Sequence, residues 1–114
     1  MCQAYEAERN LIVSFENNAT IKGFAAARWG VLKKHNPYHK FEKYSREAWD
    51  HGWVCWRSKK PLLPWALEQQ LPFGERTKAR LRFEKTRKLP EALLRAVEFW
   101  DQVAAADASL DGRQ

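Results

Sequence analysis

Basic and aromatic side chains alternate along one stretch of the first half of the chain, and together they could bind RNA. Lysines neutralise phosphates and exposed rings stack on unpaired bases, so the mixture suits structured RNA better than it suits reading duplex DNA. The bland alternative is a solvated positive loop with core tyrosines. The candidate RNA-binding residues are Lys33, Lys34, His35, Tyr38, Lys40, Lys43, Arg57, Lys59 and Lys60, with Tyr44 as a further ring.

A second basic run covers residues 76–88, after which the charge turns negative. The preferred interpretation of this run is a solvated helix face. If it is functional, it would extend the phosphate-binding surface. The net charge of +6 over 114 residues also points to an acidic partner, most often a nucleic acid. The secondary basic face consists of Arg76, Lys78, Arg80 and Arg82.

Catalytic and metal-binding patterns are weak. The serines lie in no recognisable motif and the glycines form no phosphate-binding loop, so we expect neither an enzyme nor a cofactor. His51 and Cys55 are four apart and share a helix face, and with His35 and His39 they could hold zinc. The spacings are not those of zinc fingers, so ordinary surface and core roles are preferred and no metal is expected.

Two helices, one before Pro37 and one after it, must position the RNA-binding candidates. Small residues recur at spacings of three and four on the first helix, and bulky residues recur at the same spacings on the second. Because rings pack well where a backbone can come close, we expect a helical hairpin with the indoles in the small-residue groove. Pro37 closes the hairpin, and Ser45 is the expected N-cap of the second helix. The small strip is Gly23, Ala26, Ala27 and Gly30, and the ridge is Trp49, Gly52, Trp53 and Trp56.

Over residues 20–57 the sequence resembles the ribosome modulation factor family. The resemblance implies a small basic protein that binds ribosomal RNA on the small subunit and silences translation. Three features depart from the family: Ala27 replaces a usual second glycine, the loop from Tyr38 to Trp49 is two residues longer, and a C-terminal extension follows. The matching residues are Gly23, Phe24, Ala26, Gly30, Pro37, Tyr38, Trp49, Gly52 and Trp53.

The remaining segments complete an all-α domain of four or five short helices. An amphipathic helix is expected over 3–17, ended by Asn17, Asn18 and Thr20. Residues 75–88 alternate at strand period, but helix is preferred because a lone strand has nothing to pair with. A short helix follows Pro64 and a longer one follows Pro90. We predict the hairpin and N-terminal helix over 1–60, a helical extension packed on it over 61–106, and a disordered tail over 107–114.

The tryptophans leave a second function open. Trp29, Trp49, Trp53 and Trp56 are expected in the core, whereas Trp65 and Trp100 could dock a partner protein or a second copy. The alternative is therefore an inhibitor, encoded by a phage or mobile element, that binds an acidic host protein. A DNA-binding regulator is less favoured, because a tryptophan ridge has few groups that read base edges. Two cysteines, no membrane-spanning run and no signal peptide favour the cytoplasm.

Overall fold

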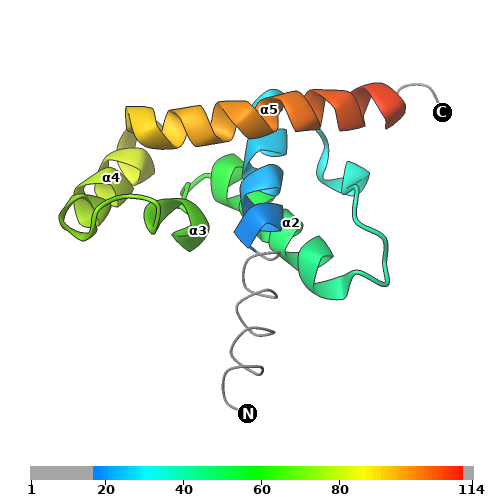
Figure 1. Cartoon of the computed structure of the whole chain (residues 1–114), viewed down its shortest axis with the longest axis horizontal. Coiled ribbons are helices and arrows are strands. Elements are labelled where there is room, and N and C mark those ends of the chain that lie inside the picture. The colour runs from blue at the N-terminus through cyan, green and yellow to red at the C-terminus, as the bar shows by residue number, and fades with distance from the viewer. Residues whose placement is uncertain (1–16, 112–114) are drawn as a thin grey trace, which may run out of the picture.

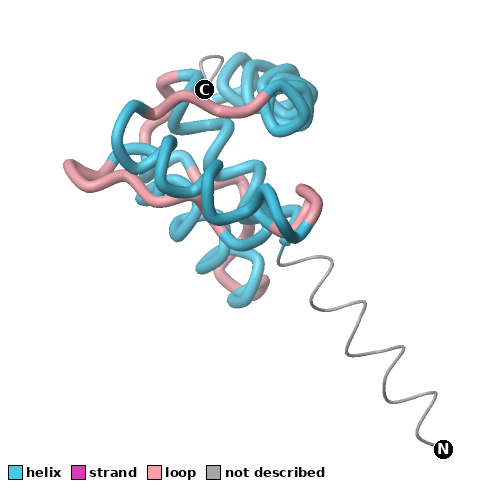
Figure 2. The backbone as a smooth tube through the Cα atoms, turned by 90° about the vertical axis from the view of Figure 1, so that its left-hand side faces the viewer, coloured by secondary structure: helices cyan, strands magenta, loops and turns pink. Residues whose placement is uncertain are grey.

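The computed structural model describes residues 17–111, which form helices and connecting loops without a strand (Figures 1 and 2). The predicted all-α class is confirmed. In Figure 1 the long last helix lies across one edge of the molecule, above the helix over 17–29 and α2, while α3 and α4 lie at one end. The elements are the helix over 17–29, η1 (Lys33–His35), α2 (Lys43–Arg57), α3 (Trp65–Glu68), α4 (Phe73–Thr86) and α5 (Glu91–Asp111).

The helix over 17–29 crosses α2 with backbone against backbone. A Cβ atom on Gly23 would lie 1.9 Å from the carbonyl oxygen of Trp49, and one on Gly52 would lie 1.9 Å from that of Thr20. Each glycine follows by three positions the residue whose carbonyl faces the other glycine, so the contact is reciprocal. Both positions therefore require glycine, because no side chain fits between the two helices.

The indoles flank this crossing, so the predicted nesting is right only in part: Trp49 packs on Ala26 of the small strip, but Gly23 meets the backbone of α2 and not a ring. Trp49 is buried in a small cluster with Ala26 and Val31. Trp56 packs against a larger cluster, where its ring meets Phe24 edge to face at 5.4 Å. The groove receives the α2 backbone because the two glycines let the helices approach more closely than a ring would permit.

Gly30 and Trp29 do not belong to the packed interface, contrary to prediction. Gly30 has a φ of +101° and ends the first helix: its N–H and that of Val31 both donate to the Ala26 carbonyl, at 3.0 and 2.9 Å. Trp29 is 56% exposed, because six residues place it about 120° around the helix from Gly23.

The larger cluster joins α3, α4 and α5 to the hairpin. Phe24 and Phe83 are fully buried with ring centroids 5.5 Å apart, and Leu93 and Val97 cover them from α5. These side chains are the apolar positions of amphipathic helices, so hydrophobic burial is what assembles them. The cluster comprises Ile21, Phe24, Ala25, Cys55, Leu63, Ala66, Leu67, Leu71, Ala79, Phe83, Leu93 and Val97.

Two arginines connect helices that are far apart in the sequence. Arg87 ends α4 in the left-handed conformation, with a φ of 56°, and donates to the carbonyls of Trp56 at 3.3 Å and Ser58 at 2.6 Å. It thereby satisfies backbone acceptors at the C-terminus of α2. Arg28 pairs with Asp101 and so links the helix over 17–29 to α5.

Several predicted boundaries move. Residues 17–20 are helical and Thr20 is buried in the crossing, so the predicted break there is wrong. The predicted helix over 3–17 lies almost wholly outside the described residues.

Ser45 lies inside α2 and is not its N-cap, because Glu42 already closes the preceding turn: its backbone N–H donates to the His39 carbonyl at 2.8 Å. The tail does not begin at 107, since α5 continues to Asp111 through an alanine-rich stretch that favours helix. The helices predicted after Pro64 and Pro90 and over 75–88 are confirmed.

Within residues 17–111, every helix is too short or too polar to cross a lipid bilayer. This observation concerns the described helices alone.

We predict that Gly23→Ala or Gly52→Ala lowers the free energy of unfolding by more than about 3 kcal/mol, because the added methyl must separate the two backbones. Gly74→Ala is the matched control: nothing lies within 4 Å of its Cβ position, so the change should be neutral or stabilising by up to about 1 kcal/mol. Urea denaturation measures all three. A crossing variant as stable as the control would contradict the described contact.

The Arg28–Asp101 pair predicts a pH dependence of stability. Burial raises the pKa of Asp101 above its ordinary value, and the nearby Arg28 guanidinium only partly opposes this. The other carboxylate oxygen, Oδ1, is buried and has no partner among the described residues. The folded protein therefore holds the Asp101 proton more tightly than the unfolded chain, whose pKa is about 3.9.

This contribution to stability is fully present below the unfolded pKa and is lost as the pH rises through the higher folded pKa. As the pH rises from the unfolded pKa through the folded pKa of Asp101, the free energy of unfolding of the wild type should fall relative to that of Asp101→Asn. Urea denaturation of both proteins at a series of pH values measures the difference. A difference that does not change with pH would contradict the burial of this carboxylate.

Candidate nucleic-acid interface

Asn36 fixes the corner between the two hairpin helices. Its side-chain amide donates to the Arg46 carbonyl at 2.8 Å and to Asp50 Oδ1 at 3.1 Å. Its Oδ1 accepts the Tyr38 N–H at 2.9 Å, across the intervening Pro37. One asparagine thus closes the local turn and anchors it to α2, which explains why Asn-Pro-Tyr forms a defined corner.

The segment leading into the corner lies along one face of α2. The indole N–H of Trp53 donates to the Val31 carbonyl at 2.7 Å, and the Arg46 guanidinium donates to the Tyr38 carbonyl at 2.7 Å. Trp53 is nearer the end of α2 and Arg46 nearer its start. Residues 31–38 therefore run antiparallel to α2, and η1 lies beside its middle.

Exposed cations line this segment and both ends of α2, and we call them the corner surface. Each is exposed, and none forms an ion pair with the side chains that the structure describes. Since α2 has 15 residues, its two ends lie about 20 Å apart, with η1 between them. The corner surface is Lys33, Lys34, Lys40, Lys43, Arg57, Lys59 and Lys60.

The remaining two RNA-binding candidates differ in accessibility. His35 is exposed on η1. Tyr38 is half-buried against the cluster of Trp49, and the Lys22 ammonium lies 4.9 Å from its ring centroid. Tyr38 therefore holds the corner in place and offers little ring surface for stacking.

A better stacking ring, Phe41, is absent from the sequence-based candidates. It is 83% exposed, its ring lies 4.8 Å from that of His39, and the Lys40 ammonium lies 5.3 Å from its centroid. Tyr44 nearby is 67% exposed. The available signal was a phenylalanine inside a charged turn, between Lys40 and Glu42, where no core position is expected.

The secondary basic face is not one surface. Arg76 donates to the carbonyls of Leu71 at 3.0 Å and Gln69 at 3.1 Å, and Arg80 reaches Glu68 at 3.4 Å. Both arginines thus border the α3–α4 junction. The other two members, Lys78 and Arg82, line a separate hollow with Leu71, Ala79 and Pro90.

The two docking candidates also separate. Trp65 is 62% exposed on α3. Trp100 is half-buried against the larger cluster, with Lys22 at 5.9 Å from its ring and Phe99 edge to face at 5.3 Å. Of these two tryptophans, Trp65 is the one whose indole is mostly exposed to solvent.

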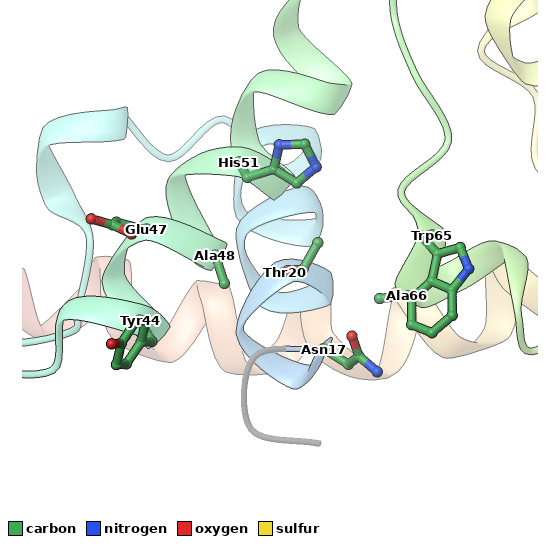
Figure 3. A pocket seen from close by; sticks show the side chains of 8 residues that line it. All are labelled: Asn17, Thr20, Tyr44, Glu47, Ala48, His51, Trp65 and Ala66. Carbon is green, nitrogen blue, oxygen red and sulfur yellow. The ribbon is translucent and has the colours of Figure 1, made fainter. Parts of the chain in front are cut away.

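Beside α2 lies an open hollow of about 370 Å³, shown in Figure 3. α2 supplies one wall with Tyr44, Glu47, Ala48 and His51, and α3 supplies the other with Trp65 and Ala66. Asn17 and Thr20, from the helix over 17–29, lie between the two walls. The hollow therefore extends from a ring next to the corner surface to the exposed indole of α3.

The histidines and cysteine do not converge as a metal site. His51 Nε2 lies 3.6 Å from Cys55 Sγ, whereas His39 Nδ1 accepts the Phe41 N–H at 3.2 Å. Over residues 17–111, no group of three or more His, Cys, Asp or Glu side chains could hold a metal ion. Burial raises the pKa of the Cys55 thiol to about 11, so this cysteine stays protonated at neutral pH and is a poor nucleophile.

Comparisons with protein-family models, with curated proteins and with solved structures find no match to this chain. The likeness to the ribosome modulation factor family therefore stays a prediction made from the residues themselves.

Proposed function

We propose that this protein binds structured RNA through the corner surface and regulates translation by occupying its site, without catalysis and without a cofactor. The observation that carries the proposal is a set of exposed cations around a rigid corner that lack carboxylate partners among the described side chains. Such charges repel one another unless an anion approaches, and a phosphate backbone supplies a row of anions.

The geometry favours RNA with unpaired bases over duplex DNA. Phe41 and Tyr44 are exposed rings next to Lys40 and Lys43. Rings stack on unpaired bases, whereas duplex DNA would need side chains directed into a groove. Ribosomal RNA is the leading candidate, because the hairpin residues resemble those of the ribosome modulation factor family. The proposal also includes a cytoplasmic location, supported by a sequence with only two cysteines, too few for a disulfide framework.

The alternative hypothesis, an inhibitor that docks through Trp65 and Trp100, is supported by only one of these two tryptophans. Trp100 is half-buried, so a docking face would depend on Trp65. Affinity purification from cells with and without nuclease treatment separates the two functions: a partner that survives nuclease is a protein, and one that is lost was held by nucleic acid.

We predict that replacing Lys33, Lys34 and Lys40 together by alanine weakens binding to a stem–loop RNA and lowers the steepness of its salt dependence. Each lost phosphate contact should remove about 0.7 to 0.9 from the slope of log affinity against log salt, hence about 2 to 3 in total. Fluorescence anisotropy over a salt series measures both effects, and cosedimentation with ribosomes tests the ribosomal target.

Lys78, Lys85 and Lys88 replaced together by alanine form the matched control, since they are exposed and the net charge falls equally. The control should keep most of the affinity. Equal losses in both triple variants would show that charge alone, and not the corner surface, attracts RNA.

A further inference from the structure

A second hollow, between α3 and α4, has an unusual lining. Its volume is about 370 Å³, and no aliphatic side chain borders it among the described residues. Every lining side chain is a ring, a guanidinium or a hydrogen-bonding group. The lining residues are Trp65, Glu68, Gln69, Phe73, Arg76, Thr77 and Arg80.

Two large rings at this hollow are left in solvent. Trp65 is 62% exposed and Phe73 is 85% exposed, although other apolar residues of the same segment, such as Leu67 and Leu71, are buried. Exposed rings that border one concave site are typical of a binding surface. The flat face of each ring is suited to stacking on another planar group.

An arginine is held in place beside these rings. Arg76 donates to the Leu71 and Gln69 carbonyls, and its guanidinium carbon lies 5.6 Å from the Phe73 ring centroid. Carbonyl acceptors orient the guanidinium without neutralising its charge. Arg80 adds a second guanidinium, whose nearest carboxylate oxygen, on Glu68, is at 3.4 Å. The site therefore keeps a net positive charge next to aromatic surface.

We propose that the hollow between α3 and α4 binds an unpaired nucleotide of the RNA, with the base stacked on Trp65 or Phe73 and a phosphate near Arg76 and Arg80. Bases in single-stranded RNA are recognised by stacking on aromatic rings and arginine planes. This inference rests on the proposed RNA-binding function and lies outside residues 20–57, which carry the family resemblance.

The position of Trp65 supports a shared RNA. This indole borders both the α3–α4 hollow and the hollow of Figure 3, whose far wall includes Tyr44 at the corner surface. A single strand leaving the corner can follow the two hollows in succession. The carboxylate of Glu47 in the first hollow disfavours phosphate there, so the strand's phosphates face outward at that point and its bases inward.

The lining argues against an apolar peptide as the occupant. Peptide anchors insert into pockets that aliphatic and aromatic side chains enclose. Here the positive charge and the hydrogen-bonding groups Gln69 and Thr77 instead match a nucleotide, which combines a planar base with an anion.

The test compares two RNAs: a blunt stem–loop and the same stem–loop with an overhang of about five adenosines, near the lower end of the ~4–16 nucleotides that single-strand binders cover. Wild-type protein should bind the overhang RNA about tenfold more tightly. Trp65→Ala with Phe73→Ala should remove this difference and leave affinity for the blunt RNA unchanged. Fluorescence anisotropy measures all affinities.

Two further variants sharpen the result. Trp65→Tyr with Phe73→Tyr should preserve the overhang preference, because stacking rings remain. Leu81→Ala is the matched control, being an exposed apolar side chain on α4 outside the hollow; it should change neither affinity. Circular dichroism checks that each variant is folded.

The outcomes separate the two proposals. If the corner-surface triple variant loses both RNAs while the Trp65 and Phe73 alanine variant keeps its overhang preference, the corner function stands and the nucleotide site is refuted. Absence of an overhang preference in the wild type refutes the site as well. Loss of both RNAs to the same extent in the alanine variant would assign these rings a different role.

Discussion

The contact on which the structure depends is the reciprocal approach of two glycine-bearing backbones. Gly23 meets the carbonyl of Trp49, and Gly52 meets that of Thr20. Helices at this separation leave no room for side chains, so neighbouring residues must pack on either side. Trp49 consequently lies in one cluster and Trp56 against the other. The crossing therefore determines which aromatic residues become core and where α3 to α5 can dock.

The same crossing places the corner. Residues 31–38 run along one face of α2, and hydrogen bonds from Trp53, Asn36 and Arg46 attach them to it. The polar side chains of Trp53, Asn36 and Arg46 are hydrogen-bonded in this contact, while the lysines are exposed to solvent. A preordered cationic surface loses little conformational entropy when it binds an anion, which is the advantage the proposed RNA contact would have.

Much of the fold could be predicted from periodicity, because apolar spacing and proline positions report helices directly. Gly23 and the helix after Pro90 are examples. The role of Gly30 could not, since a glycine that ends a helix and one that permits a close crossing look alike in sequence. The prediction that Trp29 lies in the core rests on residue type alone, and its position about 120° around the helix from Gly23 leaves it exposed instead.

The sequence is enough to predict which cations of the candidate site are exposed, but not how the charged side chains are arranged in space. Lysines at the corner remain exposed as expected, because long charged side chains rarely find buried partners. Arg87, by contrast, donates to the backbone carbonyls of Trp56 and Ser58, which lie 31 and 29 positions away in the sequence. Such partners depend on tertiary structure and leave no local pattern. Arg76 donates to the Leu71 and Gln69 carbonyls in the turn just before its own helix. Phe41 is absent from the sequence-based candidates, because a single ring in a charged turn belongs to no apolar periodic pattern.

A nuclear Overhauser spectrum of the protein, recorded alone and with a stem–loop RNA, tests whether the two glycine-bearing helices cross in contact and hold the corner surface. We expect cross-peaks between the α-protons of Gly23 and Gly52 and protons of the facing helix in both spectra, with amide shifts on RNA addition concentrated in residues 33–43 and 57–60. Spectra without contacts between the two glycines and the opposite helix would contradict this crossing.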